Sequence, residues 1–161
     1  MQNTKDSFYM ALRTRLTVLN PARTVLQRGA VRPGILVEEA ESPFSEVPAD
    51  VFMLRWLRIG IDADLNTPMM DAECEIAYQT MGTQAFGGLD RGRSLSEMDG
   101  ELLKLLTPLQ TSKFCYAANP PVALLTQVFW EQPVFGPAVS LRDRISRSVK
   151  VRVHCYLEEG E

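Results

Sequence analysis

The run VFMLRWLRIGID at residues 51–62 constrains the fold more than any other stretch of the chain. Successive side chains of an extended strand point to opposite faces, and this run places large apolar residues on both. Arg55 and Arg58 interrupt each face once. A strand with two apolar faces must be covered on both sides. The run therefore predicts a central strand of a sheet, or a strand whose second face is buried by another subunit.

Two further segments alternate between apolar and polar residues. Residues 73–82 place Cys74, Ile76 and Tyr78 opposite glutamates and a glutamine, which predicts a half-solvated antiparallel strand paired with 51–62. Residues 147–157 alternate in the same way and predict the last strand of the chain. Shorter β-rich runs predict strands at 23–29, 33–41, 113–118 and 123–132.

Two helices are predicted from apolar stripes with helical spacing. The first carries its stripe from Phe8 to Leu19, with start signals at Asp6 and Ser7 and a stop at Asn20-Pro21. In the second, Ser94 and Glu97 have the spacing of a capping box, which predicts a start at Ser94. Its stripe continues to Leu105 and is followed by Pro108.

The order of these elements predicts one α+β domain over residues 1–161, with a mainly antiparallel sheet and two helices packed on one face. With 45% hydrophobic and 23% charged residues, the composition is that of a globular protein. The net charge of −3 argues against binding nucleic acid or an anionic membrane over the whole surface, although local arginine patches remain open. No signal-like or membrane-spanning apolar run is present, so we expect a soluble protein made in the cytoplasm.

The residues that most often carry chemistry are isolated from one another. Cys74, Cys115 and Cys155 are far apart and form no close pair of the kind that zinc or redox motifs require. His154, the single histidine, is expected to be an exposed residue on the last strand, and no nucleophile motif accompanies it. We therefore expect no catalytic residues, no metal site and no cofactor.

The stretch FGGLDRGRS at residues 86–94 joins the strand predicted at 73–82 to the second helix. Its glycines lack the spacing of phosphate-binding loops, and Asp90 would lie among the phosphates. The stretch is therefore interpreted as a mobile connector that exposes Arg91 and Arg93. The acidic run at Glu38, Glu39 and Glu41 is interpreted as a solvated loop or a subunit contact.

Taken together, the predicted elements resemble the tail terminator proteins of long-tailed bacteriophages and the related minor tail proteins. The nearest local matches are DSFYMALRTRL, entering the first helix, and RSVKVRVHCYL, the closing strand. The resemblance implies a non-enzymatic subunit that forms a ring, expected to be a hexamer, on the end of the tail tube. It also implies partners in the tail tube and head-completion proteins, and a place in the virion tail after assembly. At 161 residues the chain is longer than the simplest such proteins, and the loop at 38–50 has no role in the pattern.

A ring requires two different complementary patches on each subunit. One hypothesis pairs Arg55 and Arg58 with the acidic run 38–41 of a neighbouring copy. A second places Arg91 and Arg93 in a pore through which DNA passes without its sequence being read. The alternatives to an assembly protein are a small-molecule-binding or enzymatic α+β domain with a pocket between sheet and helices, and a protein-interaction domain outside any phage.

Overall fold

The computed structural model describes residues 1–38, 47–62, 67–107 and 109–158. Its two described helices are α1 (Gln2–Leu19) and α3 (Arg91–Leu105), and a short 3-10 helix, η1 (Gln84–Phe86), precedes α3. The strands are β1 (Thr24–Gln27), β2 (Ala30–Pro33), β3 (Ile35–Val37), β4 (Phe52–Asp62), β5 (Met69–Thr80), β6 (Gln110–Cys115), β7 (Val122–Trp130), β8 (Val134–Phe135), β9 (Val139–Leu141) and β10 (Arg144–Tyr156).

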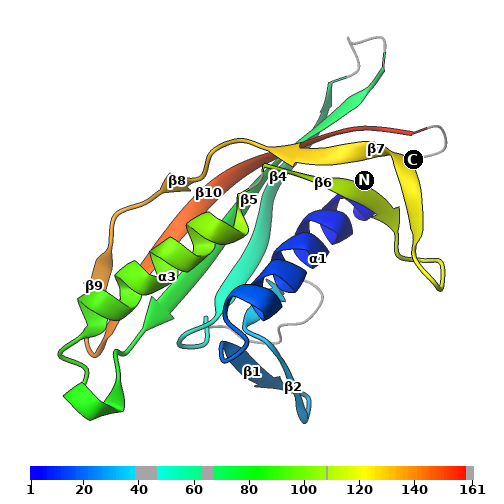
Figure 1. The fold of residues 1–161 in the computed structure, drawn as a ribbon. Coiled ribbons are helices and arrows are strands. Elements are labelled where there is room, and N and C mark those ends of the chain that lie inside the picture. Colours follow the sequence, from blue (N-terminus) through cyan, green and yellow to red (C-terminus); the bar gives the residue numbers. More distant parts are fainter. Residues whose placement is uncertain (39–46, 63–66, 108, 159–161) are drawn as a thin grey trace.

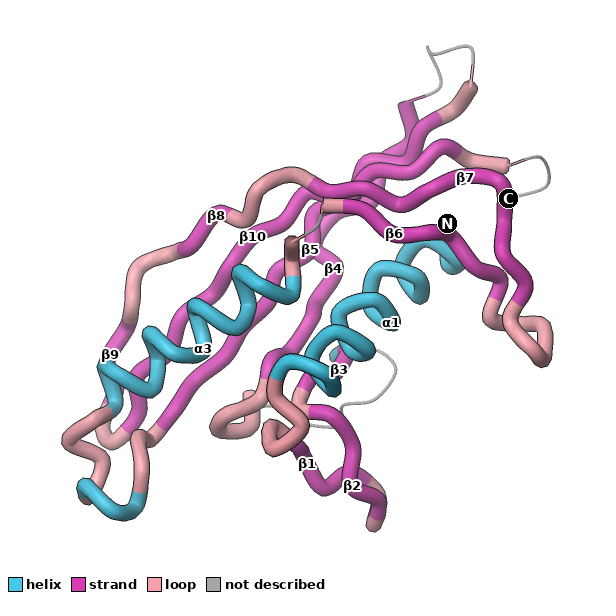
Figure 2. The backbone as a smooth tube through the Cα atoms, viewed as in Figure 1, coloured by secondary structure: helices cyan, strands magenta, loops and turns pink. Residues whose placement is uncertain are grey.

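One large sheet runs in the order β3-β4-β5-β10-β7-β6. All of its pairings are antiparallel except the one between β3 and β4. The strands β7, β8 and β9 follow one another along the same edge of β10, as Figure 2 shows. The hairpin of β1 and β2 forms a separate two-stranded sheet.

Both helices lie on the same face of the large sheet (Figure 1), as the sequence predicts for this α+β fold. The main core forms between them and the sheet. Phe8 of α1 is fully buried and meets Trp56 and Trp130 edge to face, at ring-centroid distances of 5.8 and 5.1 Å. The inward side chains of β5 and β10 complete this core, as their alternation predicts.

The strand β4 differs from the prediction over its second half. The side chains of Phe52, Leu54 and Trp56 are buried in the main core, whereas Ile59 and Ile61 are 41% and 50% exposed. The register with β5 shifts between Trp56 and Arg58, so the alternation of β4 is interrupted at a bulge. The strand is therefore covered on its core side near its start and left open toward its end.

Both helices begin earlier than their capping signals predict. The helix α1 starts at Gln2, and Asp6 and Ser7 lie inside its first two turns. The helix α3 starts at Arg91, and the backbone N–H of Ser94 donates to the carbonyl of Asp90 as an ordinary intrahelical bond. The predicted capping box at Ser94 is therefore wrong, because the helix has already formed one turn before that residue.

The remaining differences concern short strands. The run 23–29 contains only β1, and residues 30–33 form its hairpin partner β2. In the run 33–41, whose described part ends at Glu38, Pro33 ends β2 and Ile35–Val37 forms β3. The strands β8 and β9 were not predicted, since prolines interrupt the segment that carries them. None of the helices in the described part of the chain is long and apolar enough to cross a membrane.

Candidate functional site

The face of the large sheet opposite the helices carries rows of charged side chains. Alternation along β5, and along β10 from Ser148 onward, sends apolar side chains to the core and acidic and basic side chains to this outer face, whereas Arg147 points toward α3. The Nζ of Lys150 lies 2.6 Å from Oε1 of Glu73, and the Nη2 of Arg152 lies 3.2 Å from Oδ2 of Asp71. The hydrogen bond to Glu73 raises the pKa of Lys150. Such pairs of opposite charge are favourable across neighbouring strands.

Arg55 extends this charged surface onto β4. Its Nη2 donates to Oε2 of Glu75 at 2.6 Å, and its Nε lies 3.7 Å from Oε2 of Glu38. The hydrogen bond and charge of Glu75 raise the pKa of Arg55. Arg58 follows the bulge in β4, and its register partner on β5 is Glu73. The contact expected between neighbouring copies is thus formed by Arg55 and Glu38 inside one chain, while Glu39 and Glu41 lie outside the described residues.

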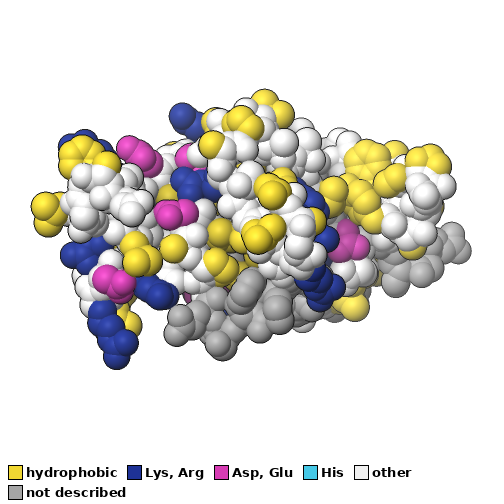
Figure 3. All heavy atoms as spheres, turned by 90° about the horizontal axis from the view of Figure 1, so that it is seen from below, with side chains coloured by type: hydrophobic (Ala, Val, Ile, Leu, Met, Phe, Trp, Pro, Cys, Tyr) yellow, Lys and Arg dark blue, Asp and Glu magenta, His cyan; other side chains and the backbone are white. Residues whose placement is uncertain are grey.

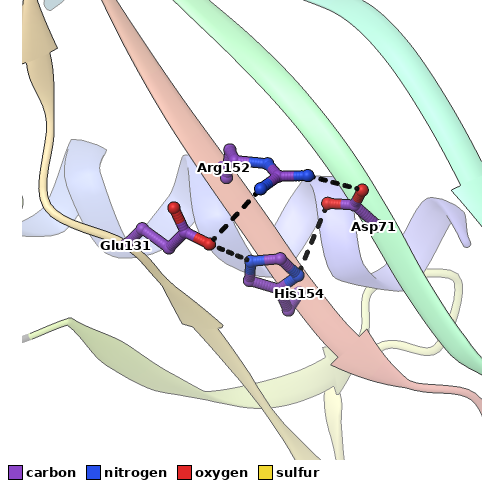
Figure 4. Close-up of polar contacts among 4 residues, drawn as sticks. All are labelled: Asp71, Glu131, Arg152 and His154. Atoms are coloured by element: carbon purple, nitrogen blue, oxygen red, sulfur yellow. Dashed lines mark hydrogen bonds and ion pairs between the residues drawn. The ribbon is translucent and has the colours of Figure 1, made fainter.

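Figure 4 shows a polar cluster of this face, made by Asp71, Glu131, Arg152 and His154. The Nδ1 of His154 lies 3.4 Å from Oδ1 of Asp71, and its Nε2 lies 3.2 Å from Oε1 of Glu131. The imidazole ring stacks on Phe129 at a centroid distance of 5.5 Å. The His154 side chain is only 13% exposed, so the expectation of an exposed histidine is wrong.

This cluster ties three strands together and lacks the geometry of a hydrolytic triad. Asp71 comes from β5, His154 from β10, and Glu131 directly follows β7. A triad requires a hydroxyl or thiol beside the imidazole, and within the described ranges the contacts of His154 are carboxylates and an aromatic ring. Across the same ranges, no three His, Cys, Asp or Glu side chains are grouped to hold a metal ion.

Sequence reasoning missed Asp71 and Glu131 as partners of His154. Their proximity depends on the register of β5 against β10, in which Asp71 lies directly opposite His154, and on the chain path after β7. The only signal in the sequence was that acidic residues and the histidine both occupy outward positions of alternating strands. That signal does not specify which strands are neighbours.

The stretch between β5 and α3 is a closed loop with a defined structure. The carboxylate of Asp90 accepts a hydrogen bond from the backbone N–H of Thr83 at 2.8 Å and one from its hydroxyl at 2.7 Å. Gly88 has a φ of +79°, and a Cβ there would lie 2.8 Å from the carbonyl oxygen of Met81, so only glycine fits. Because a carboxylate already occupies the loop before α3, the geometry does not suit a phosphate.

The sequence placed Arg91 and Arg93 in the connecting loop. In the structure both belong to the first turn of α3. The Nη1 of Arg91 donates to the carbonyl oxygen of Arg142 at 3.0 Å and so joins the helix to the turn between β9 and β10. Arg93 is exposed, and its charge lowers the pKa of Asp90 further, after the larger effect of the hydrogen bonds from Thr83. The pair therefore lies at one end of the molecule, with Arg91 partly engaged and Arg93 open to solvent.

The hydrogen bonds from Thr83 hold the pKa of Asp90 below its usual range. A carboxyl with a lowered pKa stabilises the folded loop above the ordinary aspartate range and loses that contribution as the pH falls. Hydrogen exchange of the Thr83 amide, corrected for intrinsic rates, should therefore accelerate on acidification. In Asp90→Asn it should be faster already at neutral pH and no longer change with pH. Equal protection in both proteins across this pH range would contradict the assignment.

An open cavity of about 560 Å³ lies on the outer face near β9. Its wall combines apolar side chains of Val47, Val139 and Leu141 with the polar side chains of Gln79 and Ser146. Cavities of this size accommodate small molecules when their walls are mostly apolar. The cavity lies on the face opposite the helices, whereas the sequence-based alternative placed a pocket between sheet and helices.

Large apolar side chains are exposed at opposite ends of the molecule. Leu89, in the loop before α3, is 93% exposed. Phe86, three residues before it, is also exposed. Val122 and Leu125 of β7 are also exposed, Leu125 at 96%, and they point to opposite faces of that strand. In Figure 1 the label of β7 lies on the right of the view, and the start of α3 lies on the left. Figure 3 shows apolar and basic side chains side by side at the end that carries the α3 loop. These two places are candidates for contacts with other proteins.

Comparison of the sequence with models of known protein families finds no match. Comparison with curated proteins finds no match either.

Proposed function

We propose that this chain is a non-enzymatic assembly subunit of the tail-terminator type, which joins copies of itself into a ring on the end of a phage tail tube. The observation that carries the proposal is that two separate places on the surface expose large apolar side chains, Phe86 with Leu89 before α3 and Leu125 on β7, here called the apolar patches. A ring arises when one patch of a subunit meets a different patch of the next. The resemblance of the predicted elements to tail terminator proteins supplies the particular assembly.

The charged outer face supports a structural role for the same chain. Its carboxylates and cations are largely neutralised by each other across strands, as in the contacts of Glu73 with Lys150 and of Asp71 with Arg152. A side chain that acts in acid–base catalysis needs a reacting group within hydrogen-bond reach. In the described ranges the His154 cluster offers a carboxylate to each ring nitrogen and no nucleophile. We propose that the ring stops tube polymerisation and presents a surface to the head-completion protein.

The proposal predicts that Leu89→Asp or Leu125→Asp reduces ring formation by about tenfold or more, because a charge would be buried at the contact. Light scattering coupled to size-exclusion chromatography, over a range of protein and salt concentrations, measures the assembly. Val18→Asp is the matched control, since Val18 is highly exposed on α1 and lies at neither patch. Circular dichroism should be unchanged in all three variants.

Purified tail tubes provide the second arm of this test. If the ring forms only on a template, the wild-type protein should be monomeric alone and should cap tubes seen by electron microscopy, while both patch variants should not. A protein that remains monomeric at every concentration and leaves tail tubes uncapped would overturn the proposal.

A second candidate function rests on the cavity beside β9. Its volume of about 560 Å³ and its mixed lining suit a small molecule, which would make the chain a ligand-binding domain. Calorimetry with a panel of nucleotides and small carboxylates separates the two functions. Saturable binding that is lost in Val139→Asp would favour the ligand-binding function, whereas ring formation without ligand would favour the assembly function.

A further inference from the structure

Among the described residues, the second half of β4 has a strand edge without a pairing partner. The strand β3 pairs with β4 only from Phe52 to Leu54, on the side away from β5. From Arg58 to Asp62, no strand of the described residues pairs with that side of β4. Figure 1 shows the ends of β4 and β5 projecting beyond the helices, at the top of the view. An open edge exposes backbone N–H and C=O groups that can pair with another chain.

The sequence of this edge is complementary to itself in the antiparallel direction. Residues 58–62 read Arg-Ile-Gly-Ile-Asp. When two copies pair antiparallel about Gly60, Arg58 lies opposite Asp62 of the second copy, and Ile59 lies opposite its Ile61. Each contact occurs twice, because the arrangement is two-fold symmetric.

The faces of the strand agree with this register. Arg58, Gly60 and Asp62 alternate with the two isoleucines, so the charged residues share the outer face and the isoleucines share the helix side. Both isoleucines are exposed in the single chain. Pairing would cover them against each other while opposite charges meet on the other face, and opposite-charge pairs and β-branched pairs are favourable across strands.

We propose that residues 58–62 of β4 pair antiparallel with the same residues of a second copy of this chain, so that the two sheets become continuous across a two-fold axis at Gly60. A parallel in-register pairing would instead place Arg58 against Arg58, which is unfavourable. Proteins often protect open edges with proline or with cations that repel a second copy. This segment contains no proline, and its one cation is matched by its own Asp62 in the antiparallel register. The contact is independent of the ring proposed above, because it uses one patch twice and neither of the apolar end patches.

Charge reversal at the edge gives a direct test. Arg58→Asp places two carboxylates opposite each other at both symmetric positions, and Asp62→Arg places two cations there. Each single variant should weaken dimerisation by about tenfold or more in sedimentation equilibrium, from the loss of two attractive pairs and the gain of two repulsive ones. The double variant Arg58→Asp with Asp62→Arg restores opposite charges and should recover the wild-type dissociation constant within about threefold.

Disulfide trapping tests the position of the axis. A Cβ at Gly60 would meet its nearest atoms only at 3.8 and 4.0 Å, and Gly60 has no positive φ, so Gly60→Cys fits the strand. Antiparallel partners have Cα atoms about 4.5 or 5.5 Å apart, within the range that a disulfide spans. Gly60→Cys in a Cys115→Ser background should therefore form a covalent dimer on mild oxidation. The remaining cysteines, Cys74 and Cys155, are buried.

Val18→Cys in the same background controls for collisions between exposed thiols and should give little covalent dimer. If the double charge variant fails to restore association, or if Gly60→Cys cross-links no faster than Val18→Cys, the proposed pairing is wrong. Ring formation can be scored in the same experiments on the wild-type protein. Absence of rings with the two-fold pair intact would overturn only the assembly function, and rings without the two-fold pair would overturn only the strand pairing.

Discussion

Phe8→Ala is expected to lower the free energy of unfolding by about 4 kcal/mol, a large part of the stability of a domain of this size. The Phe8 side chain is fully buried and is the contact through which α1 meets Trp56 and Trp130. Removing the ring leaves a cavity between the helix and the sheet and deletes two edge-to-face contacts. Urea unfolding followed by circular dichroism measures the change, and the slope with denaturant should stay constant.

Two variants show whether this effect comes from the aromatic contacts or from the helix alone. Phe8→Leu keeps most of the buried volume and should cost about 1–1.5 kcal/mol. Val18→Ala alters the same helix at an exposed position and should change stability by less than about 0.5 kcal/mol. A loss of under about 1 kcal/mol in Phe8→Ala would mean that α1 does not seal the core as the structure indicates.

Asp99→Ala is expected to cost about 3 kcal/mol, because it breaks a largely buried polar network between α3 and the sheet. Asp99 accepts a hydrogen bond from the hydroxyl of Tyr78. Its Oδ2 also forms an ion pair with Nη1 of Arg147 at 2.6 Å. The ion-paired side chains are only 24% and 20% exposed, so Arg147 would keep a charge with little access to water. Burial, followed by the contact with Asp99, raises the pKa of Tyr78, which therefore remains a donor.

A double-mutant cycle isolates the ion pair within this network. The double variant Asp99→Ala with Arg147→Met should lose less free energy of unfolding than the two single variants lose in sum. The reason is that Arg147→Met removes the charge that Asp99→Ala leaves without its partner. Asp99→Asn should retain part of the stability through the hydrogen bond from Tyr78. Strict additivity in the cycle, measured by denaturant unfolding, would show that Asp99 and Arg147 act independently.

The strongly periodic segments were predictable because burial on one face leaves a regular trace in sequence. The stripe from Phe8 to Leu16 predicted the helix α1, and the alternation from Val149 to Cys155 predicted β10. Local capping signals were weaker guides. Asp90 uses its side chain to close the preceding loop, so α3 starts without a side-chain cap and before the residue that the capping pattern indicated.

The polar clusters could not be predicted, since their members are distant in sequence. His154 meets Asp71 and Glu131 only because β10 lies between β5 and β7. The same applies to Tyr78, Asp99 and Arg147, which reach one another across the sheet and α3. The sequence suggested that Arg55 pairs with the acidic run of a neighbouring copy. In the structure, the pairing of β4 with β5 places Arg55 beside Glu75 of its own chain.

By itself, the sequence determined that this chain forms an α+β domain with two helices on a mainly antiparallel sheet, because the periods of its apolar residues specify which segments are helix or strand and which face is buried. Only the tertiary structure decided the strand order, the register that pairs opposite charges on the outer face, and the edge at residues 58–62 that no other described strand pairs with. These features depend on which segments become neighbours after the chain closes long loops. The period of the apolar residues does not specify which strands become neighbours, because any two strands with matching patterns can pair.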